Sequence, residues 1–236
     1  MNIIILGPSG QVGGMLSEEF ASTDFPHTVN VQTVGRTAAD VEWSDGQLDS
    51  LSKILDTLNA DVVINAIAYT AVDKAESEPV KAFQANSDLP SKLSDWCEAN
   101  KALLIHFSTD FVFDGMKEGA WQEWDEVNPL STYGKSKLSG EKCIQMSQAS
   151  ALILRTSWVY GETGNNFVKT MLRLGKEREV LGVVSDQMGC PSYSRDIAKA
   201  TIKLIMQFQL NPERFTDKQQ LFHLAGSGHT SWYGFA

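Results

Sequence analysis

The sequence is poor in cysteine and has no cluster of basic residues. Its cysteines, Cys97, Cys143 and Cys190, lie far apart, and neither their odd number nor their spacing fits a disulfide framework or a metal site. Lys and Arg number 20 against 29 Asp and Glu, so the formal net charge is −9, and no basic run offers the contacts that hold a nucleic acid. These absences argue against a disulfide-rich secreted protein and against a nucleic-acid partner.

Long apolar runs and linkers are also missing. No stretch of about 18 apolar residues suggests a membrane span, and neither an internal repeat nor a Gly/Ser-rich or Pro-rich segment divides the 236 residues. Met1 and Asn2 lead directly into the apolar run 3–6, without the basic start and small-residue cleavage site of a secretory leader. We therefore expect a cytoplasmic protein with one large domain, or a large domain with a small appendage, and no membrane partner.

The amino-terminal segment has the order strand, glycine turn, helix. The apolar run 2–6 is followed by a GxxGxxG loop and an amphipathic stretch over 15–20. Glycines let a backbone approach a pyrophosphate closely, and the unpaired N–H groups of a helix N-terminus bind it. Tight structural turns use the same glycine spacing, but the position directly after a buried strand favours a dinucleotide cradle. The residues predicted to form it are Gly7, Gly10, Gln11, Val12 and Gly13.

A second strand is predicted over 29–34 and leads to the point where a dinucleotide-binding fold meets the adenosine ribose. A carboxylate there would bind the 2′-hydroxyl of NAD, but the next residues are Gly35, Arg36 and Thr37. Arg36 could accommodate the 2′-phosphate of NADP, although a solvated surface arginine explains the same residue. Glu42 and Trp43 are candidates for contacts with the adenine.

Strand and helix patterns then continue to alternate. Helices are predicted over 48–58, 72–76 and 88–99, and strands over 61–70 and 103–107. This alternation predicts an α/β fold with a doubly wound parallel sheet. Ligands of such sheets bind at the carboxyl ends of the strands, where small residues after the third strand would admit a cofactor. The predicted cofactor site therefore also includes Ala66, Ala68, Tyr69 and Thr70.

A tyrosine and a lysine four residues apart follow the fourth strand. On a helix, Tyr133 and Lys137 project from one face, and a cation beside a phenol lowers the pKa of the phenol. Tyr133 could then transfer a proton, while a hydroxyl of Ser108 or Thr109, at the end of the strand, holds a substrate carbonyl. A half-buried ring beside a solvated amine would give the same spacing, so the pair alone decides nothing.

Several longer runs, spread over nearly the whole chain, are more specific. They cover residues 65–79, 108–113, 155–160, 164–167 and 186–191. Together they resemble the dTDP-4-dehydrorhamnose reductases, a family of extended short-chain dehydrogenase/reductases with a Rossmann fold. The resemblance implies that the 4-keto group of dTDP-6-deoxy-L-lyxo-4-hexulose is reduced to give dTDP-L-rhamnose, with NADPH or NADH as the hydride donor.

The resemblance also implies roles for single residues. Tyr133 would donate the proton, Lys137 would bind the nicotinamide ribose and tune Tyr133, and Thr109 would orient the dTDP-sugar. The other implied contacts are Phe107 with the cofactor, and Ser108, Asp110 and Trp158 with the substrate. A core aromatic after a strand would equally explain Trp158. Family members can form homodimers with Mg²⁺, but no ligand set in the sequence requires a metal.

The same resemblance divides the chain. Residues 1–160 would form the NAD(P)-binding Rossmann domain, to which 194–224 return, and 161–193 with 225–236 would form part of a small substrate lobe. Family members run beyond the segment that resembles 229–233, so we expect this lobe to be truncated at Ala236. Two other functions remain open at this stage: a nucleotide-sugar epimerase of the same superfamily, and a non-catalytic regulatory subunit similar to the β-subunit of methionine adenosyltransferase.

Overall fold

A parallel sheet organises the computed structural model, which describes residues 1–23, 29–35, 48–210 and 219–236. Its six strands follow the order β2-β1-β3-β4-β5-β9. Their bounds are β1 (Asn2–Leu6), β2 (Asn30–Val34), β3 (Val62–Asn65), β4 (Leu103–Thr109), β5 (Ser150–Thr156) and β9 (Gln219–His223). The chain moves outward from β1 to β2 and then returns to the other side of β1, which confirms the doubly wound α/β fold.

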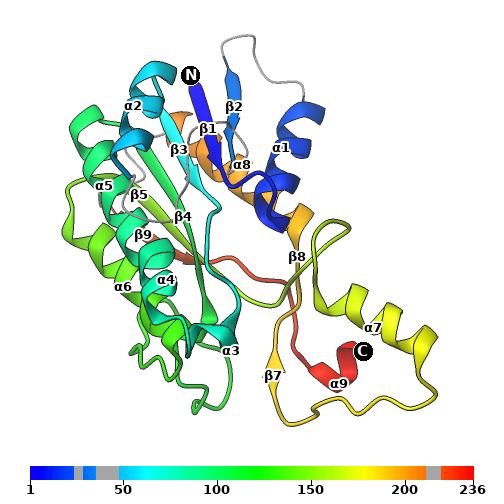
Figure 1. The fold of residues 1–236 in the computed structure, drawn as a ribbon. Helices are drawn as coiled ribbons and strands as arrows, with labels where there is room; N and C mark the ends of the chain where they lie inside the picture. The colour runs from blue at the N-terminus through cyan, green and yellow to red at the C-terminus, as the bar shows by residue number, and fades with distance from the viewer. Residues whose placement is uncertain (24–28, 36–47, 211–218) are drawn as a thin grey trace.

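Helices cover both faces of the sheet (Figure 1). Alternate residues of a strand face opposite sides, so Ile4 and Leu6 of β1 join one core cluster while Ile3 and Ile5 join another. The first cluster lies under α2 (Leu48–Leu58), α5 (Leu89–Asn100) and α6 (Thr132–Met146), and the second under α1 (Gln11–Ser22) and α8 (Ser194–Leu210). Because both faces are buried, the central strands are continuous apolar runs rather than alternating ones.

Short elements follow β3 and β4. After β3 come α3 (Val72–Ala75), α4 (Pro79–Phe83) and a π-helical turn, η1 (Gln84–Asp88), which runs into α5. The 3-10 turn η2 (Asp110–Val112) follows β4 directly. The strand expected over 61–70 is shorter than predicted and ends at Asn65, because the N–H of Ile67 bonds to the Asn65 side chain and that of Tyr69 to the Asn86 side chain.

The remaining elements form a group at the lower right of Figure 1, which we call the aromatic lobe. It contains β6 (Val159–Tyr160), α7 (Phe167–Glu177), β7 (Met188–Gly189), β8 (Ser192–Tyr193), β10 (Thr230–Ser231) and α9 (Trp232–Phe235). Its aromatic rings pack against one another: Trp158 stacks on Trp232 with centroids 3.5 Å apart, and the Phe167 ring lies 4.6 Å from that of Trp232. Over the described ranges, no helix is both long and apolar enough to cross a membrane.

Candidate active site

Three segments with predicted site residues meet at the carboxyl ends of the strands. The glycine loop follows β1, residues 66–70 follow β3, and η2 follows β4, and these strands are neighbours. A Cβ atom added at Gly7 would lie 2.9 Å from Ile67 Cγ1 and 3.2 Å from the carbonyl group of Ala66, so the first two segments are in direct contact. This edge lies between β1 and β3, where the chain reverses its direction across the sheet and where ligands of such folds bind.

The glycines of the loop differ in whether backbone conformation or packing requires a residue without a side chain. Gly7 has a φ of 79°, which side-chain-bearing residues rarely adopt. A Cβ at Gly13 would overlap the carbonyl oxygen of Gly7, so α1 and the loop pack without room for one. A Cβ at Gly10, in contrast, would meet only the carbonyl oxygens of Gly7 at 3.5 Å and Ala66 at 3.9 Å. The protein itself therefore does not require a glycine at position 10.

The space over Gly10 fits a bound phosphate. Gly10 is the residue before α1, and it supplies no side chain to cap the first N–H groups of that helix. Such groups and the helix dipole favour an anion at this point. An open cradle with unpaired donors is what the pyrophosphate of a dinucleotide needs.

Lys137 is buried below the end of β4. Its side chain is 1% exposed, and Nζ donates a hydrogen bond to the Phe107 carbonyl oxygen at 2.6 Å. The same nitrogen lies 3.4 Å from Nε2 of His106. Burial lowers the pKa of Lys137 to about 8, against the opposing charge of Glu141. The amine therefore releases its proton more readily than a surface lysine.

The pKa of Tyr133 is shifted in the opposite direction from the one predicted from the sequence. The ring packs beside Tyr69 and lies edge-on to Phe111, with centroids 5.5 Å apart. Burial raises the pKa of Tyr133 to about 12; the Thr109 hydroxyl lowers it in part, and the charge of Asp110 raises it further. The prediction that Lys137 lowers this pKa is wrong, because the amine is turned toward Phe107 and His106. The phenol consequently keeps its proton at neutral pH.

The end of β4 supplies the other polar groups. Thr109 Oγ1 donates to Asp110 Oδ1 at 3.1 Å and accepts the N–H of Phe111 at 3.2 Å, which caps η2. Burial raises the pKa of Asp110 to about 6, although the Thr109 hydroxyl opposes this. Ser108 Oγ is buried, and it finds no hydrogen-bond partner in the described part of the chain. An unpartnered hydroxyl and a carboxyl that titrates near neutral pH thus lie where the substrate was expected.

Other predicted cofactor contacts are engaged by the protein. Tyr69 donates its phenol to Glu78 at 2.7 Å, and its backbone N–H and carbonyl are held by the amide of Asn86 at 2.9 and 3.1 Å. Ala68 is partly exposed and Thr70 is exposed. These residues line the edge of the sheet, but the Tyr69 phenol is committed to a carboxylate.

Two predicted residues connect the sheet to the aromatic lobe. Gln11 donates to the Asn165 carbonyl oxygen at 3.3 Å and accepts from Asn166 Nδ2 at 3.1 Å, while its neighbour Val12 packs against the core. Trp158 has a φ of 44° and stacks in the lobe. The predictions for Arg36, Glu42 and Trp43 lie outside the described residues.

Comparisons with known proteins decide the family. The family model described as RmlD substrate binding domain matches residues 1–236. The dTDP-4-dehydrorhamnose reductase of Salmonella typhimurium is 40% identical over 236 residues, which cover 100% of this chain and 76% of that protein. The chain belongs to the dTDP-4-dehydrorhamnose reductase family.

Solved structures of dTDP-4-dehydrorhamnose reductases share the fold. The crystal structure from Clostridium acetobutylicum has a TM-score of 0.87 and 35% identity, and the match covers 100% of this chain and 78% of that one. The crystal structure from Bacillus anthracis, in complex with NADP, has a TM-score of 0.87 and 32% identity, covering 99% and 77%. The family resemblance found in the sequence is therefore confirmed.

Several buried polar residues at this end of the sheet were not predicted from the sequence. Asn65 and His106 sit inside apolar strands, and Glu141 of α6 binds Arg155 of β5 through two hydrogen bonds of 2.9 and 2.7 Å. Such residues are costly to bury without partners. A single Asn or His within an otherwise apolar run was the available signal, but the run alone does not say which residue it meets.

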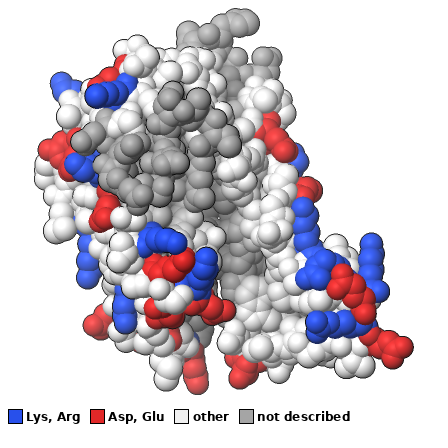
Figure 2. All heavy atoms as spheres, viewed as in Figure 1, with Lys and Arg blue, Asp and Glu red and all other residues white. Residues whose placement is uncertain are grey.

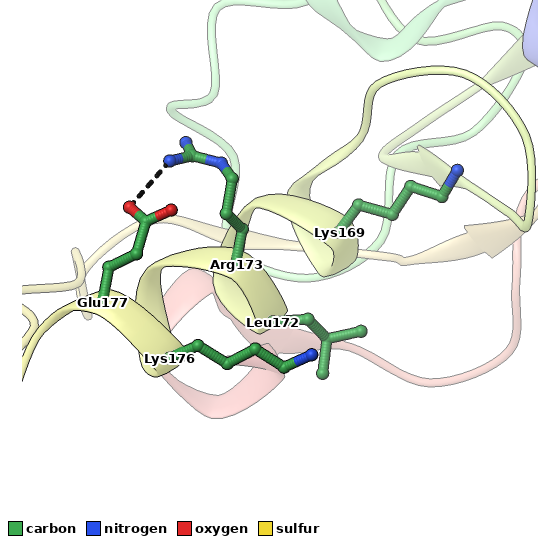
Figure 3. A pocket seen from close by; sticks show the side chains of 5 residues that line it. All are labelled: Lys169, Leu172, Arg173, Lys176 and Glu177. Atoms are coloured by element: carbon green, nitrogen blue, oxygen red, sulfur yellow. Dashed lines mark hydrogen bonds and ion pairs between the residues drawn. The ribbon is translucent and has the colours of Figure 1, made fainter.

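A hollow of about 320 Å³ lies elsewhere, on α7 of the aromatic lobe (Figure 3). Its lining consists of Lys169, Leu172, Arg173, Lys176 and Glu177. All come from the exposed face of one helix, with Arg173 and Glu177 paired at 3.0 Å, and in Figure 2 charges of both signs gather there. None is a predicted site residue. Among the described residues, no three His, Cys, Asp or Glu side chains are grouped so that they could hold a metal ion.

Proposed function

We propose that this protein catalyses the reduction of dTDP-4-dehydro-L-rhamnose to dTDP-L-rhamnose with NADPH. The observation that carries the proposal is the meeting of Thr109, Asp110, Tyr133 and Lys137 at the carboxyl edge of a sheet whose first loop offers an open cradle at Gly10. Membership of the reductase family supports the substrate, and a relative of 32% identity solved in complex with NADP supports the cofactor.

When bound, NADPH would supply the hydride to C4 of the sugar. The residues of the chain stabilise and protonate the C4 oxygen. Hydride addition turns the carbonyl oxygen into an alkoxide, which takes the phenolic proton of Tyr133. A phenol with a pKa of about 12 is protonated at neutral pH, yet it is more acidic than the sugar alcohol that forms. Thr109 donates to Asp110 in the free protein, and its single hydroxyl proton would turn to the same substrate oxygen, so that charge is stabilised where it develops.

Further roles follow for the neighbouring residues. Lys137 binds the nicotinamide ribose from below the end of β4, while Gly7, Gly10 and Gly13 shape the pyrophosphate cradle. Ser108, Asp110 and Trp158 contact the dTDP-sugar. The buried, unpartnered Ser108 hydroxyl supports this assignment, because a ligand oxygen would satisfy it.

We also propose that residues 1–160 and 194–224 form the cofactor domain, and that 161–193 and 225–236 belong to the substrate lobe. Two contacts support the return of 194–224: α8 packs against the same core cluster as α1, and β9 pairs with β5. The contact between the rings of Phe167 and Trp232 supports a separate lobe, and Trp158, near the end of the first cofactor segment, stacks on Trp232.

The test is a direct assay with dTDP-4-dehydro-L-rhamnose, following loss of the reduced nicotinamide absorbance. Tyr133→Phe keeps the packing of the ring but removes the proton, so turnover should fall roughly 100-fold or more while NADPH binding is retained. Tyr193→Phe is the matched control, because that phenol bonds to Glu162 on the surface and its loss should leave turnover unchanged.

Three outcomes would contradict the proposal. No turnover with either NADPH or NADH would reject it and favour a non-catalytic regulatory subunit. Epimerisation without net loss of reduced cofactor would favour an epimerase. Turnover of Tyr133→Phe at the parental rate would mean that the proton comes from another group.

A further inference from the structure

Three buried polar side chains form a line from the sheet to α6. Asn65 of β3, His106 of β4 and Lys137 are 1%, 0% and 1% exposed. Asn65 Nδ2 lies 3.1 Å from His106 Nδ1, and His106 Nε2 lies 3.4 Å from Lys137 Nζ. In a buried line of this kind, each donor must face an acceptor, because water cannot correct a mismatch. The first two residues have no part in the proposed reaction.

A backbone N–H group determines which atom donates and which accepts in each hydrogen bond of this line. The N–H of Ile67 donates to Asn65 Oδ1 at 3.1 Å. A backbone N–H can only donate, so the amide oxygen must face it and the NH₂ group must face the histidine. Nδ1 of His106 is then an acceptor, and the one proton of the neutral ring sits on Nε2. The ring is neutral chiefly because burial holds the pKa of His106 well below its usual value.

The Nε2–H group of His106 therefore faces the amine of Lys137. An ammonium has three donors and no lone pair, whereas an uncharged amine can accept this hydrogen bond. The carbonyl of Phe107 accepts from Lys137 in either form, so it places the nitrogen without choosing the charge. We propose that His106, fixed as its Nε2–H tautomer by Asn65 and the Ile67 N–H, is a positioning residue that disfavours the ammonium form of Lys137.

The neighbouring charged groups are bound to other partners or act on other residues, so His106 is the group that sets the protonation state of Lys137. Glu141, one turn further along α6, favours the ammonium, but both of its oxygens are bound by Arg155. The charge of Asp110 in η2 acts on Tyr133, and Glu76, just after α3, binds Thr132. The catalytic use of Lys137 rests on the proposed function. The tautomer of His106 does not, and it can be measured in the free protein.

The first experiment reads the tautomer with long-range ¹H–¹⁵N NMR on protein labelled at histidine. The sequence has four histidines, and the His106 signals are assigned by their loss in His106→Gln. We expect a neutral ring with the proton on Nε2 from about pH 6 to about pH 9. A ring protonated on Nδ1, or on both nitrogens, would overturn the proposal.

The second experiment uses Asn65→Asp to reverse the donor and acceptor roles of the two ring nitrogens of His106. One carboxylate oxygen still accepts from Ile67, and the other should draw the histidine proton to Nδ1, which leaves a lone pair on Nε2 for the ammonium. We expect a reversed tautomer, unchanged signals for His223, and a shift of the pH dependence of NADPH affinity upward by about one unit or more.

Asn65→Ser is the matched control, because it removes the amide without adding a charge and should leave neither tautomer enforced. A reversed tautomer in Asn65→Asp with no change in the pH dependence would reduce His106 to a structural residue and overturn the proposal. Because the spectra need neither cofactor nor substrate, a protein without reductase activity would refute the proposed function while leaving the tautomer assignment standing.

Discussion

Asp110 is a single carboxyl group whose burial works against its charge. Its pKa is raised from 3.8 to about 6, chiefly by burial. Between these values the folded protein binds more protons than the unfolded chain, so this group lowers the free energy of unfolding as the pH rises. Asp110→Asn should therefore be more stable than the parent, by an amount that grows from about pH 4 to about pH 7 and reaches on the order of 2 kcal/mol.

Urea unfolding of both proteins at several pH values measures this difference. A gain that does not depend on pH would mean that Asp110 is not buried as a charge. A loss at high pH would mean that its carboxylate is stabilised by a partner instead.

We predict that Arg36 determines the preference for NADPH over NADH. We expect Arg36→Ala to raise the Michaelis constant for NADPH about tenfold or more and to leave that for NADH nearly unchanged, because only the 2′-phosphate makes a charge-assisted contact with a guanidinium. Arg173→Ala removes an exposed arginine of α7 and serves as the control for net charge. Equal effects on both cofactors would reject the assignment.

At the same scale, the sequence predicted which residues gather but not their protonation. The spacing of Tyr133 and Lys137 and the position of Thr109 at a strand end were enough to place them at one edge. The pKa of Tyr133 depends on burial, Thr109 and Asp110, and that of Lys137 on burial and Glu141, so both depend on distances between α6, the end of β4 and η2. A pattern within one segment contains no information about those distances.

At the scale of elements, a substitution in the glycine loop is expected to change cofactor binding without changing the stability of the fold. Gly10 has a φ of −80°, which any residue can adopt, and a Cβ there meets only ordinary contacts. Gly10→Ala should therefore leave the free energy of unfolding within about 0.5 kcal/mol of the parent, while NADPH affinity falls because the methyl group occupies the pyrophosphate cradle. Fluorescence titration with NADPH and urea unfolding measure the two effects.

Gly13→Ala is the matched variant of this loop. Its methyl group would overlap the Gly7 carbonyl oxygen, so this variant should lose stability whether or not a cofactor binds. If Gly10→Ala binds NADPH as tightly as the parent, the loop is a structural turn and the cradle lies elsewhere.

Element boundaries followed the sequence where they depend on local pattern. The helix predicted over 48–58 is α2 over the same residues, because its apolar spacing and its neighbours agree. The third strand is shorter than its apolar and small residues predicted, since the N–H groups of Ile67 and Tyr69 bond to asparagine side chains instead of a neighbouring strand. The π-helical turn before α5 was not predicted either, because Asn86 bonds to Tyr69 and Ser136, which are 17 and 50 residues away.

At the scale of the whole molecule, segments far apart in the chain complete each other. β9 extends the sheet beside β5, and α8 covers the face that α1 begins. The family resemblance suggested this return, whereas periodicity alone did not, because a late strand carries no mark of its partner. The contact between the glycine loop and the aromatic lobe was not predicted at all, since Gln11 and Asn166 are 155 residues apart.

The side chain of Asn166 lets this long-range contact be tested apart from the helix that it begins. Its oxygen accepts the N–H of Lys169 and caps α7, while its NH₂ group reaches Gln11 at 3.1 Å and the Gly161 carbonyl at 2.8 Å. Asn166→Ser keeps a capping oxygen but is too short to reach Gln11, and Gln11→Ala removes the contact from the other side. Both should speed amide hydrogen exchange over 161–166 and leave α7 and the strands β4 and β5 unchanged. Asn166→Ala should also loosen the first turn of α7, by about 1 kcal/mol or roughly fivefold in exchange, because the cap is lost. If Gln11→Ala also speeds exchange in β4 and β5, the lobe and the sheet open as one unit, and the proposed division into two domains is wrong.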